Sequence, residues 1–230
     1  MSRLNNLSCG LLLCYVTDRH SLPATESREA QETLLLKIGA AAVAGVDWIQ
    51  IREKDLSGRA CSFLAREALQ RAAISPASNG APARILVNDR LDVALSERAG
   101  GVHLGENSLP LREAKRLANA QAQSQDFLIG VSCHSLEAAR SAASDGAGYL
   151  FFGPVFATPS KAAFGAPQGL ERLAEVCRVV SIPVLAIGGI IPANASDCLA
   201  AGASGIAAIR LFQDAPDMSS VVQSLRKLKR

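Results

Sequence analysis

Short apolar runs alternate with Ala-, Leu-, Glu- and Arg-rich stretches of helical period along most of the chain. This alternation constrains the fold most, because short apolar runs between helices are typical of buried parallel strands. We expect strands at 11–18, 47–53, 84–89, 101–105, 127–133, 149–155, 183–189 and 205–212. We expect helices near 25–44, 57–74, 91–98, 110–120, 135–145, 169–179, 192–202 and 216–228.

Glycines punctuate the expected helix ends. Gly45, Gly146 and Gly202 each follow a helical stretch at the position where a left-handed cap is common. Regular strand–helix units with short connections favour a closed (β/α)8 barrel, a TIM barrel, over a doubly wound open sheet. The 230 residues suit one such α/β domain, so we expect a single TIM-barrel domain over residues 1–230.

The composition narrows the possible partners. Apolar residues make up 49 % of the chain and aromatic residues 4 %, and the net charge is +3. This charge is too small to predict a nucleic-acid or membrane partner, although it suits an anionic small molecule. The six cysteines form no C-x-x-C pair, which indicates reduced thiols, and the apolar run at 10–16 is too short to span a bilayer. We therefore expect a cytoplasmic protein, and a homodimer is one possibility.

Polar side chains gather where the expected strands end, and in a TIM barrel these ends form the active site. Arg52, Lys54 and Lys161 would bring three cations to one mouth, where they would repel one another without an anion. Gly188-Gly189 and Ile209-Arg210 follow the last two strands, where such barrels commonly bind phosphate. The other candidates are Gln50, Asn88, Asp89, Ser132, His134, Thr158 and Ser160. The pattern predicts a phosphorylated substrate.

Some of these residues also have a purely structural interpretation. Asn88-Asp89 could cap the helix that follows, and His134 could cap the next helix instead of acting as an acid or base. His103 lies in the middle of a strand, so we expect a structural role for it.

Seven short motifs resemble the thiamine phosphate synthase/TenI family and together cover nearly the whole chain. They are Y-V-T-D at 15–18, Q-I-R-E-K-D at 50–55, V-N-D-R-L-D-V-A-L at 87–95, G-V-H-L-G at 101–105, G-V-S-C-H-S at 130–135, F-G-P-V-F-A-T-P-S-K at 152–161 and A-I-G-G-I at 186–190. Each motif alone is modest evidence for membership of this family. The presence of all seven motifs in this order is strong evidence for it.

The resemblance implies a synthase that joins hydroxymethylpyrimidine diphosphate to a thiazole phosphate and releases diphosphate. It implies that the pyrimidine diphosphate is held by Gln50, Arg52, Lys54, Asn88, Ser132 and Lys161, with Asp89 on Mg²⁺. Thr158, Ser160, Gly189, Ile209 and Arg210 would line the thiazole phosphate pocket, and Gly188 is a further substrate-binding candidate. Arg52, Lys54, Lys161 and the metal would neutralise the leaving diphosphate, which is the main catalytic need of this reaction.

The sequence departs from the synthase pattern at two positions. Ser108 stands where the family has an aspartate as a second Mg²⁺ ligand, and Glu106 and Asn107 are only neighbours of that position. Arg210 stands where a phosphate-binding serine is expected. One carboxylate can hold Mg²⁺ with waters and substrate phosphates, but we expect a lower affinity.

Two alternatives to the synthase stay open. A TenI-like thiazole tautomerase would need a phosphate site and an acid or base, without a metal, and His134 is the candidate, with Cys133 a weaker one. A non-catalytic thiazole phosphate sensor would have less need of three cations. The retained diphosphate-binding residues favour the synthase.

Overall fold

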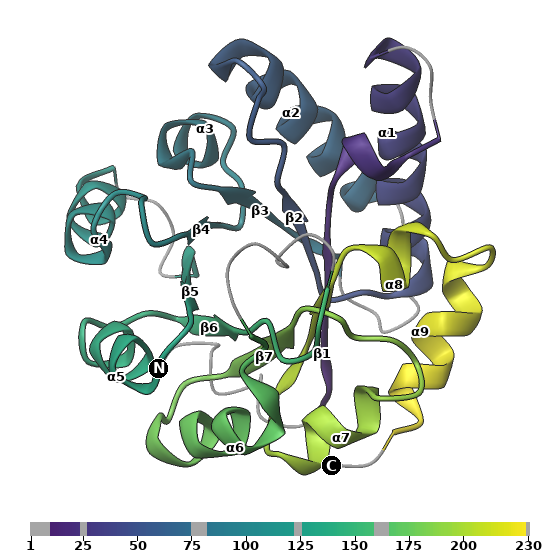
Figure 1. The fold of residues 1–230 in the computed structure, drawn as a ribbon. Coiled ribbons are helices and arrows are strands. Elements are labelled where there is room, and N and C mark those ends of the chain that lie inside the picture. Colours follow the sequence, from purple (N-terminus) through teal and green to yellow (C-terminus); the bar gives the residue numbers. More distant parts are fainter. Residues whose placement is uncertain (1–9, 24–26, 75–81, 122–125, 159–165, 229–230) are drawn as a thin grey trace.

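Eight parallel strands close into a barrel in chain order, and β8 pairs with β1 to complete it (Figure 1). The computed structural model describes residues 10–23, 27–74, 82–121, 126–158 and 166–228. The strands are β1 (Leu12–Val16), β2 (Trp48–Ile51), β3 (Arg84–Asn88), β4 (Gly101–Leu104), β5 (Leu128–Cys133), β6 (Tyr149–Phe152), β7 (Val184–Ile187) and β8 (Gly205–Ala208). The expected TIM barrel is confirmed.

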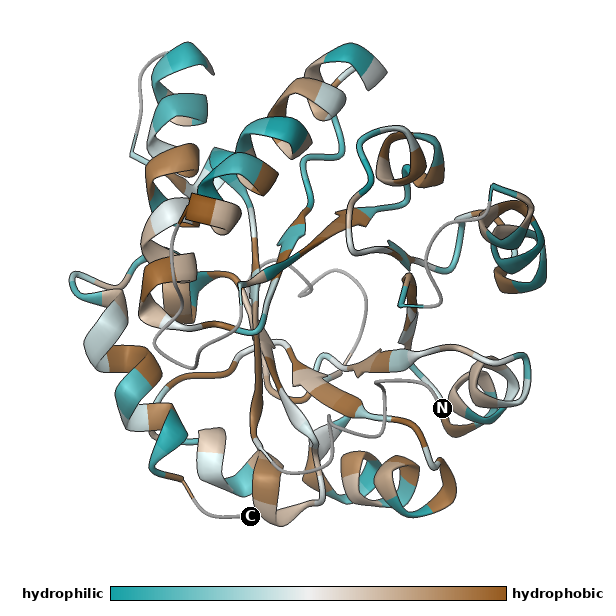
Figure 2. Cartoon of the chain, turned by 180° about the vertical axis from the view of Figure 1, so that it is seen from behind, coloured by the Kyte–Doolittle hydropathy of each residue, from teal (hydrophilic) through white to brown (hydrophobic). Residues whose placement is uncertain are grey.

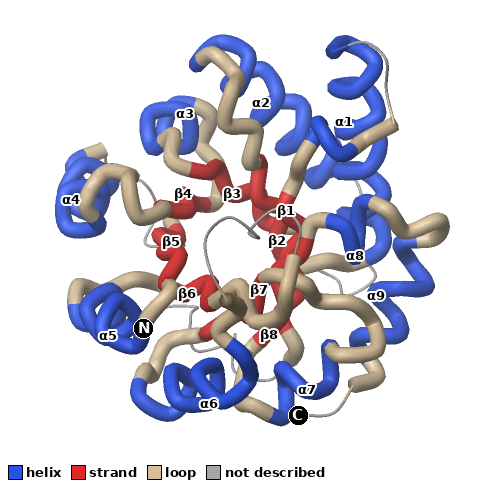
Figure 3. Tube along the Cα trace, viewed as in Figure 1, coloured by secondary structure: helices blue, strands red, loops and turns tan. Residues whose placement is uncertain are grey.

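The helices form a ring around the strands (Figure 3). They are α1 (Ser27–Ala44), α2 (Gly58–Ile74), α3 (Leu91–Ser96), α4 (Leu111–Ala120), α5 (Leu136–Ser144), α6 (Gly169–Val179), α7 (Ala195–Ala200), α8 (Arg210–Gln213) and α9 (Met218–Arg226), with a 3-10 helix, η2, at Arg19–Ser21. Gly45, Gly146 and Gly202 have φ values of 89°, 84° and 99°, as predicted for residues that end α1, α5 and α7.

The strands are largely hydrophobic along their length (Figure 2), because their two faces are buried in different layers. One layer lies between the strands and the surrounding helices. The other fills the barrel interior with Leu12, Cys14, Val16, Trp48, Leu86, Leu128, Tyr149, Phe151, Leu185 and Ala207. The interior is therefore packed, and the site can lie only above this packing, at the strand ends.

The expected strand at 205–212 was too long. Extended backbone ends at Ala208, Ile209 has a ψ of −75°, and Gln213 N donates to Ile209 O over 2.9 Å. Arg210 therefore begins the short helix α8. Apolar runs do not distinguish the end of a strand from a short buried helix, which explains this error. The expected first strand was also too long, because β1 ends at Val16 and Asp18 is the N-cap of η2.

The helix expected at 192–202 begins later, at Ala195. The three preceding residues form a turn, in which Asn194 Oδ1 accepts a hydrogen bond from Ile191 N over 2.9 Å. None of the helices in the described part of the chain is long and apolar enough to cross a membrane.

Candidate active site

A chain of hydrogen bonds links the ends of β2 and β3. Gln50 Nε2 donates to Asn88 Oδ1 over 2.8 Å, and Asn88 Nδ2 donates to Asp89 Oδ2 over 2.6 Å. The carboxylate of Asp89 accepts this hydrogen bond, so Asn88 turns its Nδ2 toward Asp89 and its Oδ1 toward Gln50. Both side-chain amides are thereby oriented. Gln50 is buried, and in the described structure its Oε1 has no hydrogen-bond partner. This leaves a buried acceptor that a ligand N–H or O–H could satisfy.

Asp89 is held in the left-handed region, with a φ of 60°. Its Oδ1 accepts hydrogen bonds from Gly105 N, over 3.2 Å, and from the hydroxyl of Ser108. The N-cap of α3 is Arg90, without a side-chain cap, so the helix-capping interpretation of Asn88-Asp89 is wrong. A residue in the left-handed region whose carboxylate is bound to a neighbouring loop, here the one after β4, is common at functional sites.

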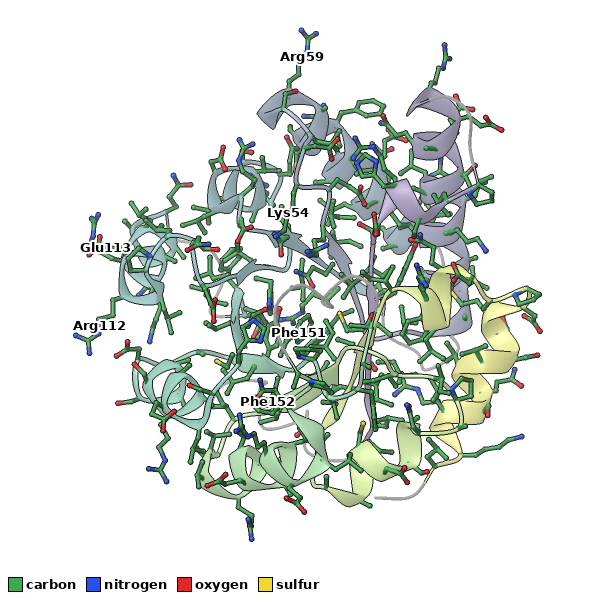
Figure 4. The ribbon with its side chains drawn as sticks, viewed as in Figure 1. Lys54, Arg59, Arg112, Glu113, Phe151 and Phe152 are labelled. Atoms are coloured by element: carbon green, nitrogen blue, oxygen red, sulfur yellow. The ribbon has the colours of Figure 1, made fainter. Side chains whose placement is uncertain are left out.

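Arg52, Glu53 and Lys54 follow the end of β2. Arg52 is half-buried and Lys54 is exposed. Figure 4 shows Lys54 inside the ring of helices, whereas Arg59 and Arg112 extend outward from it.

Glu53 is a buried charged residue at the end of β2 that the sequence pattern did not single out. Its buried carboxylate accepts hydrogen bonds from Thr17 Oγ1 over 2.7 Å and from Arg19 Nη1 over 3.1 Å. Thr17 Oγ1 in turn accepts from Arg52 N over 2.9 Å. These contacts anchor the backbone that carries Arg52. Strand alternation could have identified this residue, because it places Glu53 on the same buried face as Ile49 and Ile51. A charge buried there requires a partner.

His103, expected to be structural, contacts a predicted substrate-binding residue. Its Nε2 lies 2.8 Å from Ser132 Oγ, and its Nδ1 lies 3.0 Å from the hydroxyl of Tyr149. Burial lowers the pKa of His103 to about 3; the Asp89 charge opposes this shift and the Arg52 charge adds to it. The imidazole is therefore neutral near pH 7. Because β2, β3 and β4 are paired neighbours in the barrel, their ends lie side by side.

His134 and Cys133 are the two candidates for an acid or base at the end of β5. His134 Nδ1 contacts Gly153 O, and α5 is capped by Ser135, whose Oγ accepts from Ala138 N over 3.1 Å. The helix-capping interpretation of His134 is therefore wrong. Cys133 is buried in the layer beneath the helices, and burial, followed by the charge of Glu106, raises its pKa to about 12. This makes Cys133 a poor acid or base near neutral pH.

The turn after β7 requires both of its glycines. Gly188 and Gly189 have φ values of 94° and 66°, and a Cβ on Gly189 would lie 2.6 Å from Ala157 O. Gly188 O accepts from Phe156 N over 3.0 Å, and Gly189 O accepts from Asn194 Nδ2 over 3.1 Å. In a trans peptide the N–H points opposite to the carbonyl. The amides that follow these two carbonyls therefore point away from Phe156 and Asn194.

The remaining candidates lie on the loops after β6 and β8. Thr158 is half-buried after β6, Ile209 is half-buried, and Arg210 is exposed at the start of α8. Ser160 and Lys161 lie outside the described residues. Within the described ranges, no group of three or more His, Cys, Asp or Glu side chains could hold a metal ion.

The chain matches the family model "Thiamine monophosphate synthase" (TMP-TENI) over residues 13–212. It is 44 % identical over 217 residues to the thiamine-phosphate synthase of Methanoculleus marisnigri, covering 94 % of each chain. It is 45 % identical over 188 residues to that of Methanocella arvoryzae, covering 81 % of this chain and 84 % of the other. A solved thiamine phosphate pyrophosphorylase from Pyrococcus furiosus is similar over 95 % of each chain, with 33 % identity and a TM-score of 0.78. These findings confirm the predicted resemblance: the chain belongs to the thiamine monophosphate synthase family.

Proposed function

We propose that this protein is a thiamine-phosphate synthase, a transferase that condenses hydroxymethylpyrimidine diphosphate with a thiazole phosphate. The relatives named as synthases support this activity, and they do not support the tautomerase or the sensor. The observation that carries the proposal is the chain from Gln50 through Asn88 to Asp89, because it combines a buried acceptor for a heterocycle with a carboxylate that could hold a metal ion.

The residues at the site fit a Mg²⁺ ion held by a single carboxylate. Asp89 would be its protein ligand, and each carboxylate oxygen retains lone pairs beyond the hydrogen bonds that it accepts. Mg²⁺ commonly keeps several waters and takes its other ligands from substrate phosphates. When bound, it would neutralise charge on the diphosphate.

The protein's own cations would stabilise the leaving group. In the proposed reaction the C–O bond between the pyrimidine methylene carbon and the diphosphate breaks, and diphosphate departs with the electron pair. The thiazole nitrogen then forms the new C–N bond to that carbon. Arg52, Lys54 and Lys161 would bind the oxygens on which negative charge develops, and Ser132 would donate to one of them. Gln50 Oε1 would accept a hydrogen bond from the pyrimidine.

The thiazole phosphate would bind at the ends of β7 and β8. The peptide N–H groups of Gly189 and Ile190 point away from Phe156 and Asn194, so they can serve an anion. We propose that the phosphate of the thiazole substrate is also surrounded by Gly188, Thr158, Ser160, Ile209 and Arg210. The guanidinium of Arg210 would take the role of the expected serine by binding phosphate through two N–H groups.

The direct test is to incubate the purified protein with both substrates, with and without Mg²⁺, and to measure thiamine phosphate and released diphosphate. We expect equal amounts of the two products, formed only with the metal. Absence of thiamine phosphate at saturating Mg²⁺ would contradict the synthase. Isomerisation of a carboxylated thiazole phosphate that slows by roughly 10²–10⁴-fold in His134→Ala would instead identify the tautomerase. We also propose a cytoplasmic location, in keeping with the free thiols of Cys14, Cys61 and Cys198.

A further inference from the structure

Three side chains form a continuous relay from the barrel interior to the candidate active site. The hydroxyl of Tyr149 on β6 lies 3.0 Å from His103 Nδ1 on β4, and His103 Nε2 lies 2.8 Å from Ser132 Oγ on β5. Tyr149 and His103 are buried, and Ser132 is half-buried. The relay therefore begins in the packed interior and ends at a residue of the mouth.

A glycine makes this arrangement possible. His103 is in register with Gly130, and Gly130 is in register with Tyr149, so the three positions form one row across β4, β5 and β6. A Cβ at Gly130 would lie 2.0 Å from Tyr149 Cζ. The tyrosine ring therefore crosses β5 directly over Gly130 and reaches the histidine on the strand beyond. Any side chain at Gly130 would close this path.

The surroundings of Tyr149 determine the direction of the hydrogen bonds. Its ring packs 4.6 Å from the ring of Trp48, centroid to centroid, in the apolar interior cluster. Within the described structure, the hydroxyl has His103 Nδ1 as its hydrogen-bond partner. A buried O–H without an acceptor would be costly, so Tyr149 donates to Nδ1. A neutral imidazole then carries its proton on Nε2 and donates it to Ser132 Oγ.

We propose that this relay makes Ser132 a dedicated hydrogen-bond donor to an oxyanion in the active site. Because Ser132 Oγ accepts from His103, its own proton is left for a ligand at the mouth. His103 and Tyr149 are thus positioning residues, and they act through Ser132. The identity of the oxyanion as a diphosphate oxygen rests on the proposed function, whereas the polarity of the relay does not.

The first test measures the histidine tautomer directly. Long-range ¹H–¹⁵N correlation spectra of the full-length protein, with His103 assigned by its loss in His103→Gln, report which ring nitrogen carries the proton. We expect the Nε2–H form in the wild type and a mixture with the Nδ1–H form in Tyr149→Phe. Tyr15→Phe is the matched control, because Tyr15 is equally buried and its hydroxyl donates over 2.7 Å to Gln213 instead. An Nδ1–H form in the wild type would overturn the proposal.

The second test is a double-mutant cycle on the binding of inorganic diphosphate with Mg²⁺, measured by calorimetry. Ser132→Ala should weaken binding by about ten- to hundredfold, the effect of losing one hydrogen bond to a charged group. Tyr149→Phe should weaken binding severalfold in the wild-type background and have no effect in the Ser132→Ala background. Tyr15→Phe should leave the affinity unchanged. Equal effects of Tyr149→Phe in both backgrounds would mean that Tyr149 does not act through Ser132.

The synthase proposal and the relay proposal can be disproved independently of each other. If the wild type forms no thiamine phosphate but shows the Nε2–H form and the coupled loss of diphosphate affinity, the synthase is wrong and the relay stands. If thiamine phosphate forms and the two substitutions are independent, the relay is wrong and the synthase stands.

Discussion

Ser108 donates a hydrogen bond to Asp89 Oδ1, so a neutral hydroxyl contacts the carboxylate that we propose as the Mg²⁺ ligand, at the position where a second aspartate is expected from the family pattern. The loop that carries Ser108 is closed by a further hydrogen bond, from Gly105 N to Ser108 Oγ over 2.6 Å. Glu106 does not replace the missing carboxylate in any contact that the structure describes, and its charge acts on Cys133. Among the described residues, the proposed metal site would therefore offer a divalent cation the single carboxylate of Asp89.

Restoring the second carboxylate should tighten metal binding. We expect Ser108→Asp to lower the Mg²⁺ concentration at half-maximal activity by about tenfold, because affinity for hard cations rises with the number of charged oxygen ligands. The measurement is a Mg²⁺ titration of activity together with direct binding of Mn²⁺. Ser181→Asp, an exposed position before β7, should change neither value. Equal affinity in Ser108→Asp and the wild type would show that position 108 does not contribute to the metal site.

Arg210 should contribute to phosphate affinity. We expect Arg210→Ala to raise the dissociation constant for thiazole phosphate by about tenfold, because a guanidinium binds phosphate through charge-assisted hydrogen bonds. Calorimetry with thiazole phosphate measures the effect. Arg59→Ala removes an arginine that points outward from the ring of helices (Figure 4) and should have no effect. An unchanged constant in Arg210→Ala would mean that this side chain does not reach the ligand.

Glu53 should stabilise the fold as well as the end of β2. Its carboxylate pairs with Arg19 over 3.1 Å, and both side chains are at least nine-tenths buried. We expect Glu53→Gln to lower the free energy of unfolding by about 2 kcal/mol, because it removes the charged acceptor of the hydrogen bonds from Thr17 and Arg19, while Arg19 keeps its ion pair with Asp55. Urea denaturation measures the change. Glu32→Gln, which breaks the exposed pair between Arg28 and Glu32, should cost less than about 0.5 kcal/mol. Similar losses in the two variants would contradict the assignment of Glu53 as an anchor.

His103 should make stability depend on pH. Its pKa is lowered to about 3 in the folded protein, against roughly 6.5 in the unfolded chain. Between these values the unfolded chain binds a proton that the folded protein does not, so stability is full above about pH 6.5 and falls as the pH decreases. The expected slope is about 1.4 kcal/mol per pH unit.

Chemical denaturation at pH 7 and pH 5 isolates this contribution. We expect His103→Gln to lose less stability than the wild type over this interval. Parallel losses in His103→Gln and the wild type would contradict the lowered pKa.

The barrel could be predicted because each strand is marked by a short apolar run in its own sequence. Apolar runs such as the one at β1 are buried on both faces, and the glycines after α1, α5 and α7 end those helices through their own backbone conformation. The end of β8 was not predictable, since Ile209 could continue a strand or begin a helix and its apolar side chain suits both.

The amino-acid sequence by itself determined the architecture, the family motifs and the residue types at the strand ends, because periodicity and side-chain chemistry are properties of neighbouring residues. Only the tertiary structure decided how those residues are connected. The orientation of Gln50 by Asp89, the neutralisation of Glu53 by Arg19 and the passage of Tyr149 over Gly130 join residues from different strands and loops. Such contacts depend on the register of strands in the closed barrel, and a single strand's sequence carries no information about the neighbour opposite it.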